Sequence, residues 1–148
     1  MEQTDTTNKR KVAIGAIFGI LFFGISYFGV QQIFFKAPTF DKVMMQNASE
    51  LNKNCPIMID KYTKLDNVIA LPNNTFQYNY TLVDIIKAEV NSDTIRKYIE
   101  PGIMNYVKTN PEMKIFRDNK TTINYYYKDK NGVFVLNITV TPEIYTSK

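Results

Sequence analysis

The feature of this 148-residue sequence that most constrains its fold is an uncharged apolar segment near the N-terminus. Residues 12–30 read VAIGAIFGILFFGISYFGV, which is 19 positions without a charge. At ~1.5 Å per residue, a helix of this length approaches the ~30 Å of a bilayer core. Apolar residues resume after Gln31 and Gln32 and end at Lys36. We therefore predict a transmembrane helix over residues 12–35. A cleaved signal peptide is the alternative, but its apolar core is shorter and closes on small residues.

Flanking charge predicts the orientation of this helix. Three consecutive basic residues at positions 9–11 precede the segment, whereas Lys36 and Lys42 follow it with Asp41 between them. Positive residues favour the cytoplasmic side. We expect a cytoplasmic tail over residues 1–11 and an extracytoplasmic domain over residues 36–148.

Small residues recur along one side of the predicted membrane helix. At roughly 100° per residue, Gly15, Gly19, Ser26 and Gly29 fall in one stripe, together with Phe22. Such a stripe lets a second helix approach closely. We predict a helix-packing seam there, formed with a second copy or with another membrane protein. The alternative is that glycine is simply frequent in membrane helices.

The remainder of the chain alternates helical and strand-like patterns. Thr39 is a candidate N-cap for an amphipathic helix that ends near Lys53. Asn91 or Ser92 could cap a second helix, which Pro101 and Gly102 would kink or divide. These patterns predict an α+β domain: a small antiparallel sheet of four or five strands with helices packed on one face.

Strict alternation marks the strands of this sheet. In the clearest strand, residues 75–82, the buried face is predicted to hold Phe76, Tyr78, Tyr80 and Leu82. A hairpin is predicted around the turn at residues 129–132. Its second strand is expected to bury Phe134, Leu136, Ile138 and Val140.

Composition removes several classes of chemistry. The sequence has no His and a single Cys, which excludes a Ser-His-Asp triad, a Cys-His pair and the usual zinc sites. Asp60 and Asp66 could act as acid and base or bind a cation, but a loop that pairs with its own lysines is the simpler interpretation. We expect no catalytic residue, cofactor or metal. Cys55 would either pair with a partner chain or lie buried as an apolar thiol.

Five of the ten tyrosines, at positions 78, 80, 125, 126 and 127, fall on predicted strands. A strand surface of aromatic rings can stack nucleic-acid bases, but the basic residues are scattered, and we expect no nucleic-acid partner. Core packing accounts for most of these rings. Tyr126 is the exception, because its neighbours place it on the polar face, where it could belong to an interface.

Three short motifs follow one another in the middle of the sequence: Pro-x-x-(Val/Ile)-Asp, then Thr-x-Leu-Asp, then Tyr-x-Tyr-Thr-Leu. They fall on Pro56, Ile59, Asp60, Thr63, Leu65, Asp66, Tyr78, Tyr80, Thr81 and Leu82. In this pattern the sequence resembles a family of small, membrane-anchored bacterial proteins of unassigned function. The resemblance implies a bacterial origin and an extracytoplasmic domain, and it implies no activity.

Together these features predict a non-enzymatic, single-pass protein of the bacterial cytoplasmic (inner) membrane. Its extracytoplasmic domain would bind another envelope protein, or a second copy of itself, as an accessory or assembly subunit. Two alternatives stay open. One is a carboxylate-based enzyme of the cell envelope. The other is a periplasmic domain that binds a small ligand or lipid.

Overall fold

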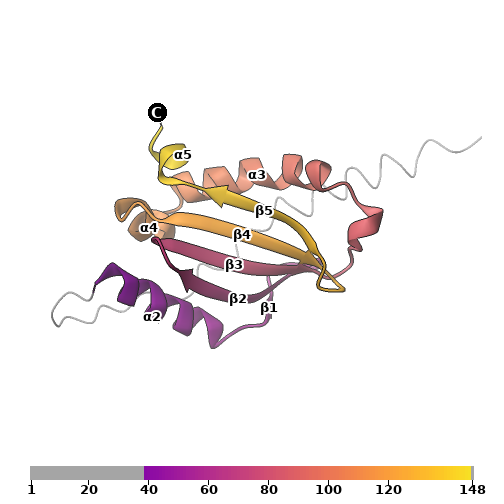
Figure 1. The fold of residues 1–148 in the computed structure, drawn as a ribbon, viewed down its shortest axis with the longest axis horizontal. Helices are drawn as coiled ribbons and strands as arrows, with labels where there is room; N and C mark the ends of the chain where they lie inside the picture. Colours follow the sequence, from indigo (N-terminus) through magenta and orange to yellow (C-terminus); the bar gives the residue numbers. More distant parts are fainter. Residues whose placement is uncertain (1–38, 148) are drawn as a thin grey trace, which may run out of the picture.

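A five-stranded sheet in the order β1-β2-β3-β4-β5 organises the computed structural model, which describes residues 39–147 (Figure 1). The strands are β1 (Ile57–Met58), β2 (Thr63–Leu71), β3 (Thr75–Leu82), β4 (Thr122–Asp129) and β5 (Phe134–Val140). The helices are α2 (Phe40–Asn52), η1 (Lys87–Glu89), α3 (Ser92–Thr109), η2 (Pro111–Met113), α4 (Lys114–Asp118) and α5 (Pro142–Thr146). The predicted α+β class is confirmed.

The sheet is mixed, and the prediction of an antiparallel sheet is therefore wrong at its centre. β3 and β4 pair in parallel, whereas the other neighbouring strands are antiparallel. The long connection between β3 and β4 contains α3, which carries the chain back to the end of the sheet where β3 began. A parallel pair needs such a crossover. Each strand alternates in the same way in either orientation, so the alternation could not reveal the direction.

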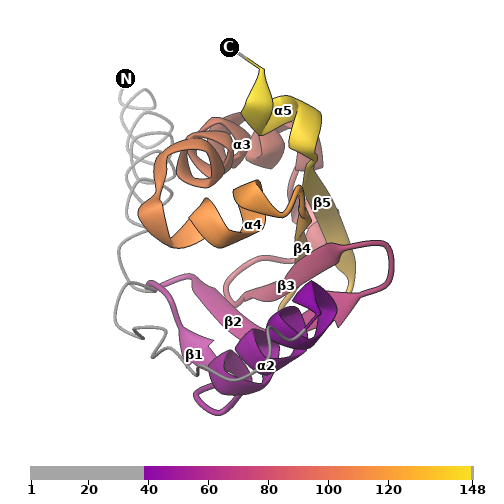
Figure 2. The same ribbon diagram turned by 90° about the vertical axis from the view of Figure 1, so that its left-hand side faces the viewer.

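The helices pack against the side chains that the strands turn inward. In Figure 2, α3 and α4 lie together on one side of the sheet. In Figure 1, α2 lies alongside β2. Asn91 caps α3 by accepting hydrogen bonds from the backbone N–H groups of Asp93 and Thr94, as the sequence predicted. Helix α3 is continuous through Pro101, so the predicted division into two helices does not occur.

Polar side chains from the helices form hydrogen bonds with backbone groups of β2 and β5. Asn52 of α2 donates to the carbonyl of Val68 at 2.9 Å and accepts from its N–H at 2.8 Å. At the other edge, Ser92 donates to the carbonyl of Val135, and Arg96 donates to that of Asn137, at 2.9 and 2.8 Å. Such contacts cover strand edges that would otherwise be open to another chain.

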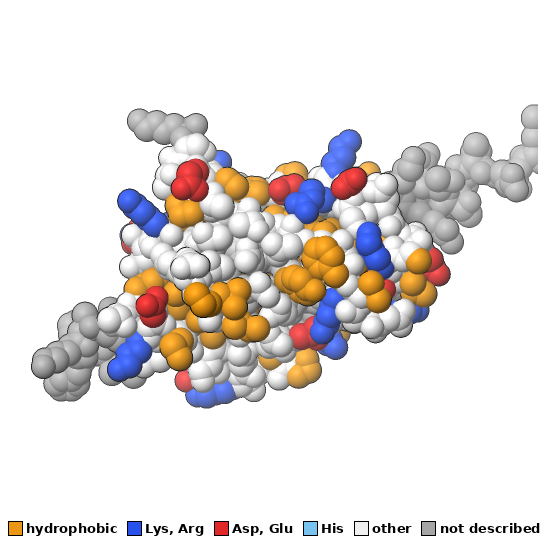
Figure 3. Space-filling model, in the orientation of Figure 1, with side chains coloured by type: hydrophobic (Ala, Val, Ile, Leu, Met, Phe, Trp, Pro, Cys, Tyr) orange, Lys and Arg blue, Asp and Glu red, His pale blue; other side chains and the backbone are white. Residues whose placement is uncertain are grey.

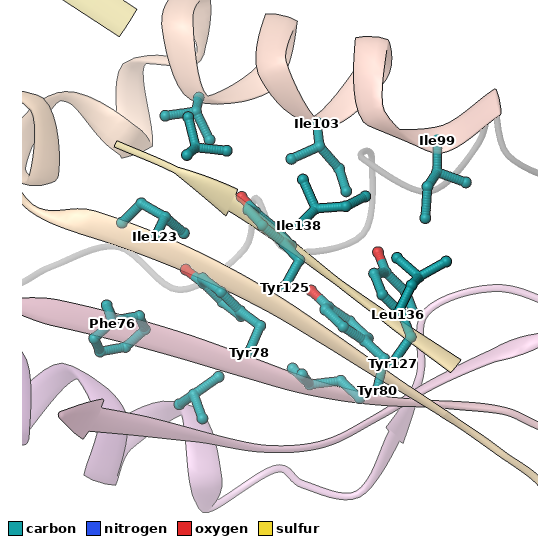
Figure 4. Packing of buried hydrophobic residues seen from close by; sticks show 14 of the residues in the cluster. Phe76, Tyr78, Tyr80, Ile99, Ile103, Ile123, Tyr125, Tyr127, Leu136 and Ile138 are labelled. Atoms are coloured by element: carbon teal, nitrogen blue, oxygen red, sulfur yellow. The ribbon is translucent and has the colours of Figure 1, made fainter. Parts of the chain in front are cut away.

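Four stacked tyrosines form the middle of the core (Figure 4). Tyr78 packs on Tyr125 with ring centroids 5.4 Å apart, and Tyr80 packs on Tyr127 at 5.1 Å. Both pairs lie opposite each other in the β3–β4 register and are buried. Helix α3 covers the core with Ile95, Ile99, Ile103 and Val107. Cross-strand packing thus explains these rings, as expected.

A bulge in the β4–β5 hairpin changes which residues are buried. Tyr127 pairs with Leu136 and Lys128 with Phe134, so Val135 is left between the two pairs. Val135 and Leu136 are both buried, whereas Phe134 is 49% exposed. The prediction that Phe134 lies in the core is wrong, because an extra residue in one strand reverses the alternation beyond it. Leu136, Ile138 and Val140 are buried as predicted.

Because of the bulge, truncation of Leu136 and truncation of Phe134 should lower the stability of the domain by different amounts. Leu136→Ala should lower the free energy of unfolding by about 2–5 kcal/mol, because it leaves a cavity in the core. Phe134→Ala should cost less than about 1.5 kcal/mol, since half of that ring already meets solvent. Urea denaturation of both variants checks the order. Equal losses would mean that the strand faces are assigned incorrectly.

Candidate functional site

One side of the sheet, which we call the open face, is a candidate binding surface. Its residues alternate with the buried positions of β2–β5 and point away from α3. They are Lys64, Asp66, Asn67, Ile69, Gln77, Asn79, Thr81, Asn124, Tyr126, Lys128, Phe134, Asn137 and Thr139. Figure 3 shows this side as largely white, with separate orange patches and few charged groups near its middle.

The strand register arranges these residues in rows across the sheet. One row runs Lys64–Thr81–Lys128–Phe134, and the next runs Asn67–Asn79–Tyr126–Asn137. The rings of Tyr126 and Phe134 meet with centroids 5.2 Å apart and planes inclined by 38°. Tyr126 is half-buried on the polar face, where the sequence placed it. Its neighbour Phe134 was missed, because finding it required the bulge.

Asp66 joins three strands on the open face. Its carboxylate accepts a hydrogen bond from Thr81 Oγ1 at 2.6 Å and lies 3.1 and 3.2 Å from the Nζ atoms of Lys64 and Lys128. Burial alone would raise the pKa of this carboxyl. The hydrogen bonds from Thr81 and both lysines outweigh burial, and the pKa lies below its usual value. The contact with Lys64 agrees with the expectation of a carboxylate paired to nearby lysines.

Asp60 has a different role from Asp66. Its Oδ1 accepts from the backbone N–H groups of Tyr62 and Thr63, at 2.7 and 2.8 Å, and so holds the turn between β1 and β2. Pro56 precedes β1, and the peptide bond between Cys55 and Pro56 is cis. No described contact joins the Asp60 and Asp66 carboxylates. Asp60 Oδ1 and the Asp66 carboxylate are engaged in structural contacts, whereas Asp60 Oδ2 is buried and has no hydrogen-bond partner among the described residues.

The other predicted residues are dispersed. Tyr78 and Tyr80 of the family pattern lie in the core and not on the open face. Cys55 is half-buried against the core, and burial, with the nearby Asp66, raises the pKa of its thiol. Within residues 39–147, no three His, Cys, Asp or Glu side chains gather to hold a metal. The predicted seam of Gly15, Gly19, Ser26 and Gly29 lies outside the described residues, as does the predicted membrane helix.

Asp129 was not identified from the sequence as an organising residue. It is buried at the end of β4, where its carboxylate accepts from the backbone N–H groups of Lys87, Asn131 and Val133, each at 2.8 Å. These bonds, with the contribution from Lys87 the largest, hold the pKa of the carboxyl below its usual value. Asp129 thereby fixes the turn that presents Phe134. The signal in the sequence was an aspartate at the first position of the predicted turn.

Comparison with known proteins shows the family and the fold. Residues 39–136 match the family described as "Domain of unknown function (DUF8479)", and the chain belongs to that family. No curated protein matches the sequence.

Three solved structures share the fold at low sequence identity. A Pseudomonas aeruginosa protein described as a candidate secreted protein covers 70% of this chain and 90% of its own, with a TM-score of 0.58 and 13% identity. The pilotin EpsS of the Vibrio vulnificus type 2 secretion system covers 73% and 93%, with a TM-score of 0.56 and 11% identity. The type II secretion system pilotin AspS from Vibrio cholerae covers 70% and 90%, with a TM-score of 0.50 and 13% identity.

The comparisons contradict one prediction. The chain was expected in the bacterial cytoplasmic (inner) membrane, but its structural neighbours are pilotins of secretion systems and a candidate secreted protein. We therefore withdraw that location. Separately, none of the helices within residues 39–147 has the length and apolar character needed to cross a membrane.

The Asp66 contacts predict a pH-dependent contribution to stability. Asp66→Asn should lower the free energy of unfolding at pH 7 by about 1–2 kcal/mol, because it removes a charged acceptor of three hydrogen bonds. A lowered pKa in the folded state stabilises the protein above the unfolded pKa of ~3.9, and this is lost as pH falls through the folded value. The difference from wild type should therefore shrink in acid.

Denaturation of wild type and Asp66→Asn between about pH 7 and pH 3 measures this difference. Asp41→Asn, at an exposed position in the first turn of α2, is the matched control and should change stability little. A difference between wild type and Asp66→Asn that is constant with pH would contradict the assigned role of the Asp66 charge.

Proposed function

We propose that this chain is a non-enzymatic accessory or assembly subunit of the cell envelope, whose folded domain binds another envelope protein. The observation that carries the proposal is the fold. Two pilotins of type II secretion systems share it over 70–73% of this chain. The roles of Asp60 and Asp66 also support it, since the carboxylates considered for catalysis are engaged in holding a turn and joining strands.

The size of a typical interface gives the proposal a spatial expectation. A stable contact buries about 800 Å² on each partner, which is a small part of a domain of this kind. One protein partner should therefore contact a contiguous set of surface positions and leave the others free. The contact can be mapped without knowing the partner in advance.

Site-specific photo-crosslinking in cells, on the full-length chain, tests the proposal. A photoreactive residue is placed singly at Met45 on α2, Tyr98 on α3, Ile69 on β2 and Lys130 in the β4–β5 turn, which are all exposed. Positions in one region should capture the same protein, which mass spectrometry identifies, and positions elsewhere should capture nothing. Capture at no position, or of unrelated proteins at every position, would contradict the proposal.

The same assay addresses the predicted membrane seam. If the seam helps the full-length chain to hold its partner, Gly19→Ile should reduce capture, because added bulk keeps the partner helix at a distance. Gly24→Ile is the matched control, since Gly24 lies nearly opposite the stripe at roughly 100° per residue. Equal capture by both variants would remove the seam from the proposal and leave the contact of the folded domain in place.

A further inference from the structure

The open face has a chemistry that the proposed function does not explain. Apart from its charged and aromatic members, it consists mainly of Asn, Gln and Thr side chains from the four neighbouring strands β2–β5. Carboxamides and hydroxyls both donate and accept hydrogen bonds. Figure 3 shows this side as mostly white, which is the colour of the backbone and of side chains that are neither hydrophobic nor charged. A ligand that fits such a surface also carries many groups that both donate and accept.

Hydrogen bonds between side chains hold the polar groups of this face in place. Gln77 donates to Asn79 Oδ1 at 2.8 Å, and Asn79 donates to Asn67 Oδ1 at 2.7 Å. On β5 and β4, Asn137 donates to Thr139, which donates to Asn124, both at 2.9 Å. Each carboxamide uses one or two of its four hydrogen-bonding positions in these chains. Asn137 Oδ1 is buried, so this residue offers only its amide N–H group to a ligand. The other unused positions are preorganised, which lowers the entropic cost of binding a ligand.

The three charges of the open face lie together and leave it a net charge of only +1. Its three charged residues are Lys64, Asp66 and Lys128, and the carboxylate lies within 3.2 Å of both ammonium groups. A strongly anionic ligand such as a nucleic acid or an acidic lipid surface would meet one aspartate between two lysines rather than a basic patch. The charge of this face therefore gives a polyanion little attraction, and recognition has to come from the polar and aromatic side chains.

The rings of Tyr126 and Phe134 supply an apolar surface beside the amide side chains of the open face. Tyr126 and Phe134 present ring surface on the β4–β5 side of the face, and the other large apolar residue of the face, Ile69, lies on β2. Figure 3 accordingly shows separate orange patches and not a continuous one. A partner helix with an apolar stripe needs continuous apolar area. A sugar ring needs one aromatic surface for its C–H groups and polar neighbours for its hydroxyls.

We propose that the open face binds an uncharged polysaccharide, namely the glycan strand of the cell wall, with a sugar ring on Tyr126 and Phe134 and its hydroxyls on the amides of Asn79, Asn137 and Asn124. The glycan proposal rests on the proposed function, because that function places the domain in the cell envelope. It goes beyond the proposed function because it gives the domain a second ligand. The protein partner then occupies a different surface.

Co-sedimentation of the purified full-length chain, in mild detergent, with protein-free peptidoglycan sacculi tests the proposal. Wild type should sediment with the sacculi, and Tyr126→Ala should weaken the apparent affinity about tenfold. Tyr98→Ala, which removes an exposed tyrosine from α3, is the matched control and should bind as wild type does. Asn79→Ala retains both rings and removes an amide opposite Tyr126, and it should also weaken binding.

Two further measurements identify what is bound. A chitin hexasaccharide, which lacks peptide stems, should compete with the sacculi. Raising the salt from about 0.05 to 0.5 M should leave binding unchanged, because the contacts are uncharged. Circular dichroism confirms that each variant is folded.

Several results would overturn the glycan proposal. These are no sedimentation, equal sedimentation of folded Tyr126→Ala and wild type, no competition by the hexasaccharide, and loss of binding in salt. Capture of a protein in cells by a photoreactive residue at Tyr126 or at Ile69 would also overturn it, since that result would make the open face a protein interface. Because sedimentation uses purified components, its failure is distinct from a failure to capture a protein partner.

Discussion

The parallel pairing of β3 with β4 determines both faces of this domain. On the inner face it places Tyr78 opposite Tyr125 and Tyr80 opposite Tyr127. On the outer face the same register places Asn79 opposite Tyr126 and Thr81 opposite Lys128. A shift of one residue would exchange the two sets, because successive side chains point to opposite faces. The core and the candidate binding surface are therefore two consequences of one register.

The tyrosine core is stabilised by burial and stacking, and it keeps its hydroxyl groups protonated. Burial is the main cause that raises the pKa of Tyr78, Tyr80, Tyr125 and Tyr127. Tyr106 of α3 contributes to the raised pKa of Tyr78, Tyr80 and Tyr125. Burial together with Glu112 raises the pKa of Tyr106 itself to about 12. Near neutral pH, the tyrosine side chains of the core therefore form an uncharged aromatic layer that carries neutral hydroxyl groups.

Much of this architecture could be predicted from local pattern. The alternation of residues 75–82 gave the correct faces of β3, and the capping and turn residues gave the start of α3 and the position of the hairpin. Tyr126 was placed correctly on the polar face. The strand order and the parallel pairing could not be predicted, because they depend on where α3 returns the chain. The bulge at Val135 also escaped prediction, and it moved Phe134 from the core to the open face.

The candidate site was predicted less completely than the fold, for a physical reason. Alternation shows that a residue is exposed, but it does not show which residues of distant strands become neighbours. Asp66 and Lys128 are 62 positions apart in the sequence (128 − 66). They meet because β2 and β4 are both neighbours of β3. The two carboxylates considered together, Asp60 and Asp66, serve a turn and a cross-strand contact respectively.

Disulfide trapping tests the parallel β3–β4 register most directly. In a Cys55→Ser background, one variant carries cysteines at Gln77 and Asn124, which are opposite in the parallel register. A second carries them at Gln77 and Lys128, which would be opposite only if the strands ran antiparallel about the Asn79–Tyr126 pair. Directly opposite residues have Cβ atoms about 4.5–5.5 Å apart, whereas four residues along a strand span about 13 Å. Under mild oxidation, mass spectrometry should find an intrachain disulfide in the first variant and free thiols in the second, and the reverse result would contradict the account.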